Sequence, residues 1–363
     1  LRIHSLAKAV SKGLSEAGVK VLTSSYFDSI TFEVPDAENF RKIAEANNSN
    51  FHYFPDGTVG LSIDEVSSCN LSDTVNTLTS IFKKSFSKDI SIVVEESAAS
   101  FGKDLTRDSG YLAHVVFNKY HSESLMMRYI KSLENKDLSL NTSMISLGSC
   151  TMKLNAATEL IPVSWPEFSQ VHPFAPASQT KGYQKIISEL EDYLCKITGF
   201  TACSLQPNSG AQGEYTGLLT IRAYHEDRKE PHRDIVLIPI SAHGTNPASA
   251  IMAGMKVIVV KSDAEGLIDV NDLKQKATEN AANLAGLMVT YPSTHGVFEE
   301  SIKKVCKIIH DNGGLVYMDG ANMNAQVGLT SPGMIGADVC HLNLHKTFAI
   351  PHGGGGPGVG PIC

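Results

Sequence analysis

From about residue 235 onward, short apolar runs alternate with amphipathic segments that have a helical pattern. Strands this apolar are buried on both faces, and strands joined by helices run parallel to one another. The sequence therefore predicts an α/β fold in which helices cover both faces of a mostly parallel sheet. The expected strands are residues 235–239, 256–260, 284–290, 315–319 and 339–343.

Ligands of such sheets bind beyond the carboxyl ends of the strands, so the residues just after each strand are the candidates for chemistry. His243 follows the first strand, in the segment S-A-H-G-T-N. An imidazole there can stack on an aromatic ligand or titrate near neutral pH. The alternative is a loop histidine that only forms hydrogen bonds.

Asp319 ends the strand predicted at 315–319, directly after the apolar residues L-V-Y-M. A buried carboxylate needs a partner, because burying an unpaired charge is costly. A protonated pyridine nitrogen would be such a partner. The alternative is an aspartate that caps the following loop.

Lys346 follows the last strand, in N-L-H-K-T. A lysine in a pocket at a strand end can have a lowered pKa and act as an amine nucleophile. The alternative is a solvated surface lysine. The glycine-rich run H-G-G-G-G-P-G at 352–358 indicates close approach of the backbone to a ligand, or a flexible loop.

The segment N-S-G-A at 208–211 precedes a helix expected at Gly210–His225. Free backbone N–H groups and the helix dipole favour an anion there, although a simple N-cap turn would look the same. An anion site, a ring contact, a carboxylate and an amine are what pyridoxal 5'-phosphate (PLP) requires. Since one domain supplies all four, the sequence predicts a PLP site.

Residues 1–110 are predicted to form a small α+β domain, 111–180 a connecting and wrapping segment, and 181–363 the PLP-binding large domain, which lacks its C-terminal side. The first part closes with a linker at 85–109, and the second contains an irregular stretch at 148–180. Helices are expected at 3–17, from Asp36 to 47, at 71–82, 122–134 and 183–198, and strands at 19–22, 29–34, 51–54 and 58–63.

Composition excludes several classes of function. The formal net charge is −7, so no basic surplus favours nucleic acid. The longest apolar runs are too short to span a membrane. The 7 cysteines include no C-x-x-C pair, which predicts a reducing compartment, no disulfide framework and no metal site.

Long stretches of the sequence carry a specific pattern: LGSCTMKLN (147–155), QPNSGAQGEY (206–215), SAHGTNPASA (241–250), TYPSTHGVFEE (290–300), YMDGANMNAQVG (317–328) and HLNLHKTFAIPHGGGGPG (341–358). In these stretches the chain resembles the PLP-dependent glycine decarboxylases, the P-proteins of the glycine cleavage system. Two shorter stretches, YHSE at 120–123 and LENKD at 133–137, also stand in family-like places.

The resemblance implies the aspartate-aminotransferase-like fold (PLP fold type I). It also implies a role for each matching position, while His295 departs from the asparagine that is usual there. The implied roles are the Schiff-base lysine for Lys346, the pyridine-nitrogen partner for Asp319, the ring-stacking residue for His243, the phosphate turn for Ser209, Gly210 and Ala211, and cofactor or substrate contacts for Thr294 and His345.

The implied enzyme is an oxidoreductase that decarboxylates glycine and passes the aminomethyl group to the lipoyl arm of H-protein. Lys346 and His243 are its candidates for proton transfer. The stretch 148–180 is expected to line the mouth of the lipoyl channel. The resemblance further implies a homodimer or a heterotetramer-like assembly, in the mitochondrial matrix of a eukaryote or the cytoplasm of a bacterium.

Two other functions stay open. One is a different PLP enzyme of the same fold, which would share the lysine, the aspartate and the histidine. The other is a non-catalytic subunit that keeps the fold, although Lys346 argues against it. The chain also looks partial, as the end of the first P-protein half joined to the start of the second.

Overall fold

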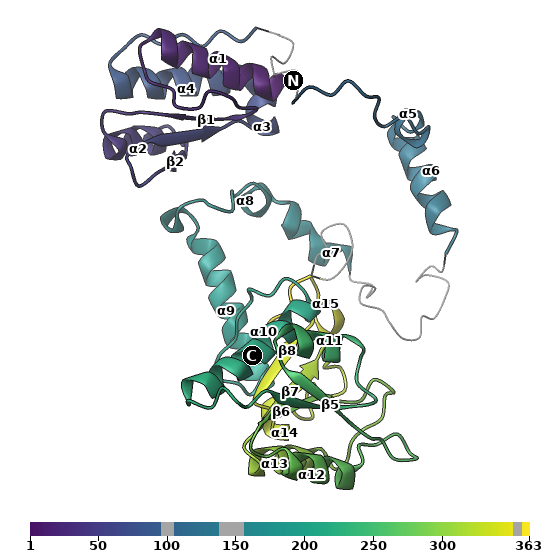
Figure 1. The fold of residues 1–363 in the computed structure, drawn as a ribbon. Helices are drawn as coiled ribbons and strands as arrows, with labels where there is room; N and C mark the ends of the chain where they lie inside the picture. Colours follow the sequence, from purple (N-terminus) through teal and green to yellow (C-terminus); the bar gives the residue numbers. More distant parts are fainter. Residues whose placement is uncertain (96–104, 138–155, 351–357) are drawn as a thin grey trace. The chain divides into compact units, whose positions relative to one another are not determined.

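The computed structural model describes residues 1–95, 105–137, 156–350 and 358–363 (Figure 1). The chain divides into two units, Leu1–Met126 and Met127–Cys363. The division at 110 and 180 expected from the sequence stays a prediction. The segment L-G-S-C-T-M-K-L-N and most of the glycine-rich run lie outside the described residues.

The first unit contains a three-stranded antiparallel sheet in the order β1-β3-β2. The hairpin predicted around Pro55-Asp56-Gly57 is confirmed, and Asp56 accepts a hydrogen bond from the backbone N–H of Thr58 over 3.0 Å. The elements are α1 (Arg2–Glu16), β1 (Ser29–Phe32), α2 (Ala37–Ala46), β2 (His52–Tyr53), β3 (Val59–Ser62), α3 (Glu65–Cys69) and α4 (Leu71–Phe86).

Asp36 caps α2 as predicted, accepting hydrogen bonds from the backbone N–H groups of Glu38 and Asn39. Two other predictions in this unit are wrong. Residues 19–22 form no strand, because only Val21 pairs, in an isolated bridge to Phe32. The segment from residue 85 does not begin as a linker, because α4 runs to Phe86 and the side chains at 90 and 92 are buried in the core of the unit.

Short helical segments and two longer helices precede the large sheet. The described part of the irregular stretch, residues 156–180, is made of single turns. The predicted helices at 122–134 and 183–198 are confirmed. The elements are α5 (Val116–Lys119), α6 (Glu123–Glu134), α7 (Ala157–Leu160), η2 (Ile161–Ser164), α8 (Pro166–Ser169), η3 (Ala177–Gln179) and α9 (Lys181–Thr198).

The large sheet has five parallel strands in the order β5-β4-β6-β7-β8, which confirms the predicted parallel sheet (Figure 1). Its strands are β4 (Ile235–Pro239), β5 (Lys256–Val260), β6 (Leu284–Thr290), β7 (Leu315–Gly320) and β8 (Val339–Leu342), and its helices are α10 (Gly210–Asp227), α11 (Thr245–Met252), α12 (Val270–Glu279), α13 (Ile302–Asp311), α14 (Pro332–Ile335) and α15 (Leu344–Thr347).

Alternate residues of each strand enter two separate hydrophobic cores. Leu237 of β4 packs in the core that holds side chains of α12 and α13. Its neighbours Val236 and Ile238 pack in the core that holds side chains of α10 and α11. Because successive side chains of a strand point to opposite faces, helices cover both faces of the sheet, as predicted.

The order of the strands in the sheet indicates where a ligand would bind. After β4, the chain first adds β5 on one side and then β6, β7 and β8 on the other. The carboxyl ends of β4 and β6 therefore lie at the point where the strand order reverses. Ligands of open α/β sheets bind in the crevice outside such a point.

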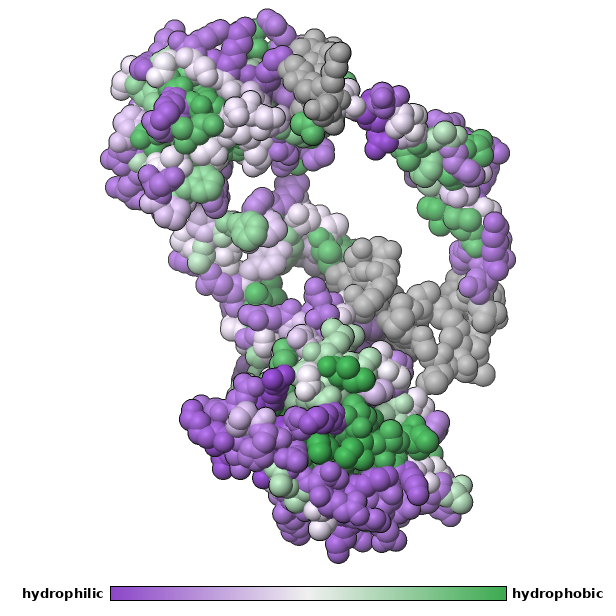
Figure 2. Space-filling view, viewed as in Figure 1, coloured by the Kyte–Doolittle hydropathy of each residue, from purple (hydrophilic) through white to green (hydrophobic). Residues whose placement is uncertain are grey.

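Apolar side chains are exposed where α11 and the edge strand β5 lie, as Figure 2 shows. They belong to Ile240, Ile251, Met252 and Val259. Apolar residues gathered on one face usually mark a surface that another chain or segment covers. In the described part of the chain, no helix is both long enough and apolar enough to cross a membrane.

Candidate active site

Glycines let α10 lie close to the sheet beside the end of β7. A Cβ at Gly213 would come within 2.8 Å of the carbonyl oxygen of Gly360, and a Cβ at Gly217 would overlap the ring of Tyr317. Only residues without a side chain fit at these two positions. The close approach carries Glu214, which lies between them in α10, to the buried end of β7.

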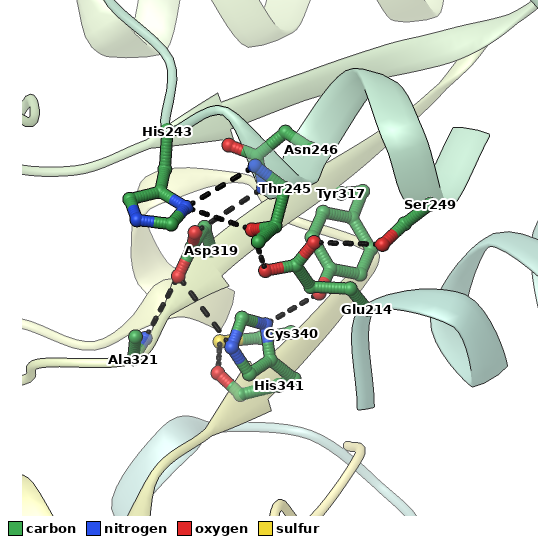
Figure 3. Close-up of polar contacts among 10 residues, drawn as sticks. All are labelled: Glu214, His243, Thr245, Asn246, Ser249, Tyr317, Asp319, Ala321, Cys340 and His341. Carbon is green, nitrogen blue, oxygen red and sulfur yellow. Dashed lines mark hydrogen bonds and ion pairs between the residues drawn. The ribbon is translucent and has the colours of Figure 1, made fainter. Parts of the chain in front are cut away.

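Asp319 lies at the end of β7 and is 5 % exposed. Oδ2 accepts a hydrogen bond from Nδ2 of Asn246 over 3.3 Å, and Oδ1 accepts one from the backbone N–H of Ala321 over 3.0 Å (Figure 3). Donors thus approach both oxygens of this buried carboxylate. This environment fits a residue that must keep a negative charge.

Two further polar residues belong to these strands, His341 of β8 and Tyr317 of β7, and no pattern in the sequence singles them out. In the register between β7 and β8, Asp319 pairs with His341. Burial raises the pKa of Tyr317 well above its usual value, so its hydroxyl keeps its proton. This hydroxyl and Nδ1 of His341 are hydrogen-bonded, and Nε2 of His341 lies 3.6 Å from Oδ1 of Asp319.

His243 lies in the loop between β4 and α11, and its side chain is exposed. Its Nδ1 lies 2.8 Å from Oγ1 of Thr245 and accepts the backbone N–H of the same residue over 3.2 Å. Thr245 also contacts Glu214, with Oγ1 2.8 Å from Oε1. The three side chains form one continuous chain of contacts in Figure 3.

Glu214 is 5 % exposed, and Ser249 donates a hydrogen bond to its Oε2 over 2.9 Å. Oxygen and nitrogen atoms of Glu214, Asp319 and His341 lie within 4.8 Å of one another. Burial, and secondarily the charge of Asp319, raise the pKa of Glu214. Sequence reasoning missed this residue, although it stands in the recognised segment Q-G-E-Y.

The predicted phosphate turn forms the N-terminus of α10. Ser209 is the N-cap, and its Oγ accepts the backbone N–H of Gln212 over 3.2 Å. Gly210 is buried, whereas Ala211 is exposed. A Cβ at Gly210 would overlap the side-chain amide of Asn343, so the end of β8 lies directly against this turn.

Lys346 lies in α15, three residues after Asn343, and is half-buried. Within the described ranges, no carboxylate lies within ion-pairing distance of its Nζ. The adjacent His345 is 1 % exposed. A half-buried amine without a carboxylate partner in the described ranges, three residues from an asparagine that lies against the phosphate turn, fits the predicted cofactor lysine.

Thr294 lies in the loop that follows β6 and is half-buried. Its Oγ1 is buried without a hydrogen-bond partner among the residues that the structure describes. Buried hydroxyl groups are normally hydrogen-bonded, so an unsatisfied one beside a candidate site indicates a ligand contact. The neighbouring His295 is exposed, and nothing in its surroundings explains the departure from asparagine.

The predicted site residues thus all follow strands of the sheet or lie at the start of α10. Two contacts join the segments that carry them. Asn246 joins the loop of His243 to Asp319, and Asn343 joins the segment of Lys346 to the turn at Gly210. The donor set fits PLP: a buried carboxylate, a half-buried amine, an exposed imidazole, a helix N-terminus and an unsatisfied hydroxyl. The roles of the individual residues remain predictions.

Comparison with known proteins gives the family. The family model for the glycine cleavage system P-protein matches residues 90–362. Glycine dehydrogenase (decarboxylating) from Christiangramia forsetii is 58 % identical over 362 residues, which cover 99 % of this chain and 38 % of the relative. The same enzyme from Shewanella amazonensis is 56 % identical over 365 residues, with the same two coverages.

The fold agrees with a solved structure of glycine decarboxylase (P-protein) of the glycine cleavage system in inhibitor-bound form. The TM-score is 0.52 at 16 % identity, covering 67 % of this chain and 52 % of the other, and it confirms the fold class predicted from the sequence. The chain spans 38 % of the length of the curated relatives it matches. On the family model and these identities, the chain belongs to the glycine cleavage system P-protein family.

Proposed function

We propose that this chain carries the PLP-binding part of a glycine decarboxylase, an oxidoreductase that transfers the aminomethyl group of glycine to the lipoyl arm of H-protein. The observation that supports it most is the buried carboxylate of Asp319, held at the carboxyl edge of the sheet by donors on both oxygens. The activity for which the relatives are named, glycine dehydrogenase (decarboxylating), supports the choice of reaction.

PLP supplies an electron sink for the bond that breaks when a carboxylate leaves as CO2. Lys346 would hold its aldehyde, Asp319 its pyridine nitrogen and His243 its ring face. The turn at Ser209, Gly210 and Ala211 would hold the phosphate. Thr294 and His345 would provide further contacts to cofactor or substrate.

The side chains around Asp319 hold its carboxylate group in position. Asn246 donates to Oδ2, and Nε2 of His341 lies 3.6 Å from Oδ1. A negative charge fixed in a buried site holds the proton of a facing pyridine nitrogen, because an opposite charge nearby favours the protonated form. Lys346 and His243 then remain the groups that can move a proton at the substrate.

The stretch 156–180 supports a contact with a partner protein. Its single turns expose Trp165, Val171 and Phe174, and Phe174 is 89 % exposed. Large apolar side chains exposed in one stretch are typical of recognition surfaces. We propose that this stretch lies at the mouth of the channel for the lipoyl arm of H-protein.

The apolar side chains exposed at α11 and β5 support an assembly of several chains, either a homodimer or a heterotetramer-like complex. Nothing about the site requires nucleic acid or a membrane. The relatives reported above come from bacteria, which supports a cytoplasmic location and gives no support to the mitochondrial one.

The test is the exchange of labelled bicarbonate into the carboxyl group of glycine, measured with and without lipoylated H-protein. The proposal predicts exchange that requires both PLP and the lipoylated partner. Exchange into another amino acid would instead indicate a different PLP enzyme of this fold. Stable PLP binding without any exchange would indicate a non-catalytic subunit.

A further inference from the structure

Cys203 and Cys363 lie opposite each other on two adjacent extended segments of the large unit. The segments pair through Ser204 and Ile362, whose backbone N–H groups donate to each other's carbonyl oxygens over 2.8 and 3.0 Å. The bridge is antiparallel, so the residue before Ser204 faces the residue after Ile362. Cys203 and Cys363 are therefore a directly opposed pair of cysteines.

The backbone hydrogen bonds determine how close the two cysteines are. The N–H of Cys363 points away from Cys203 and donates to the carbonyl oxygen of Cys340 over 2.8 Å. Cys203 and Cys363 thus form a non-hydrogen-bonded pair, in which the Cα atoms of antiparallel strands are typically about 4.5 Å apart. Disulfides join Cα atoms that are about 4.4–6.8 Å apart, so this backbone arrangement accommodates a disulfide.

The two thiol groups are in contact and remain partly accessible. Both side chains are half-buried, and both pack against the core that holds side chains of α12 and α13. A hydrogen bond between the two thiols, and secondarily burial, raise the pKa of Cys203 well above its usual value. In the reduced pair, Cys203 therefore keeps its proton, and the sulfur of Cys363 is the one that can attack an oxidant.

Two other cysteines lie near this pair, and neither combines its opposition with its access. Cys340 pairs with Cys363 on the other side, but it is 0 % exposed, and its thiol donates to the carbonyl oxygen of His341 over 3.4 Å. Cys195 lies in α9 and belongs to no segment that pairs with Cys203. The geometry therefore favours a bond between Cys203 and Cys363 over the other combinations.

We propose that Cys203 and Cys363 are a site of reversible oxidation, at which a low-molecular-weight disulfide such as oxidised glutathione converts the two thiols into one disulfide bond. The thiolate of Cys363 attacks one sulfur of oxidised glutathione, forms a mixed disulfide and releases one glutathione. Cys203 then attacks the sulfur of Cys363, forms the bond between the two cysteines and releases the second glutathione. The cysteine pair loses two electrons and two protons, and oxidised glutathione gains them in becoming two molecules of the thiol.

The disulfide would join the segment before the phosphate turn to the segment after the glycine-rich run. The same two segments also meet nearer the turn, where the N–H of Gly360 donates to the carbonyl oxygen of Pro207 over 2.8 Å. The loop closed by the bond contains every predicted cofactor residue, so oxidation would tie its two ends together without occupying the site. A reducing compartment keeps the pair as thiols, and an excess of oxidised glutathione forms the bond. This inference does not depend on the proposed function.

Peptide mapping without reduction tests the proposal. The folded chain is equilibrated in glutathione buffers with an increasing oxidised fraction, its free thiols are blocked, and the digest is analysed by mass spectrometry. The expected result is a pair of peptides joined through Cys203 and Cys363, which separates again in an excess of reduced glutathione. Cys69, which is exposed in the first unit, should carry glutathione and so shows that the oxidant has reacted.

Single substitutions identify the two sulfurs. Cys203→Ser and Cys363→Ser should each abolish the cross-link, whereas Cys69→Ser, the matched control, should keep it. The proposal is overturned if no cross-link forms in buffers that modify Cys69, or if Cys203 bonds to Cys195 or Cys363 to Cys340 instead. A bond that forms only after unfolding in urea, or that reduced glutathione does not open, would also overturn it. If a variant fails to fold, the peptide map of the wild type still decides the question.

Discussion

Asn246 donates a hydrogen bond from Nδ2 to Oδ2 of Asp319 over 3.3 Å. Asn246 lies in α11 after β4, whereas Asp319 ends β7, and β6 lies between these two strands in the sheet. The backbone N–H of Asn246 also donates to the carbonyl oxygen of His243 over 3.0 Å. Asn246 therefore holds His243 and Asp319, the two residues expected to contact the PLP ring, in position relative to each other.

Asp319→Asn should leave the fold intact and weaken the site. Asparagine has the same shape, but it has no charge to hold the proton of a pyridine nitrogen. The affinity for PLP should fall by about 10- to 100-fold, as expected for the loss of a hydrogen bond to a charged group worth ~1.5–3 kcal/mol. Bicarbonate exchange should be lost. Fluorescence titration with PLP measures the first effect, and turnover equal to the wild type would contradict the role of Asp319.

Gly217→Ala should destabilise the large unit. The new Cβ would overlap the ring of the buried Tyr317, so α10 or the ring must move. Overpacking of this kind costs about 1–3 kcal/mol. Denaturant unfolding of the chain measures the change in free energy.

Gly182→Ala is the matched control for that substitution. Gly182 lies in the first turn of α9, and among the described residues no atom outside its own stretch of helix lies within 4 Å of the position a Cβ would take. Alanine there should stabilise the chain by up to about 1 kcal/mol, because alanine has the higher helix propensity. Equal effects of the two substitutions would show that α10 does not pack closely on Tyr317.

Glu214→Gln should change how stability depends on pH. Burial raises the pKa of Glu214 in the folded state above its usual value of 4.5. Well below a pH of 4.5, the carboxyl group of Glu214 is protonated in both the folded and the unfolded wild type. As the pH rises above it, the unfolded state ionises first, so the wild type loses stability until the pH passes the raised pKa.

The glutamine variant lacks this ionisation, so its free energy of unfolding relative to the wild type should increase with pH above about 4.5. Urea unfolding at a series of pH values checks the sign. A difference that is constant with pH, or that decreases, would contradict a raised pKa for Glu214.

The parallel sheet could be predicted because each of its strands is a short apolar run bounded by polar residues. The candidates at strand ends followed from that sheet and from the rule for ligand sites. Asp36 could be predicted as a cap because capping is local and involves the next three residues. In the N-terminal unit, the residues at 90 and 92 looked like linker because serine and aspartate surround them.

Glu214 and His341 could not be predicted from local patterns. Glu214 has its partners in α11, 31 and 35 residues away, and reaches them only because glycines bring α10 onto the sheet. His341 faces Asp319 only through the register between β7 and β8. Neither relationship leaves a periodic signal in the sequence, since packing between distant segments creates both.

The most direct test of the PLP site is chemical trapping of the cofactor on Lys346. The chain is incubated with PLP, reduced with borohydride and digested, and the modified peptide is identified by mass spectrometry. Lys303, exposed on α13, provides the control variant. The predicted result is a single pyridoxyl group on Lys346 that is lost in Lys346→Ala and kept in Lys303→Ala. Modification of other lysines without Lys346, or labelling that persists in Lys346→Ala, would contradict it.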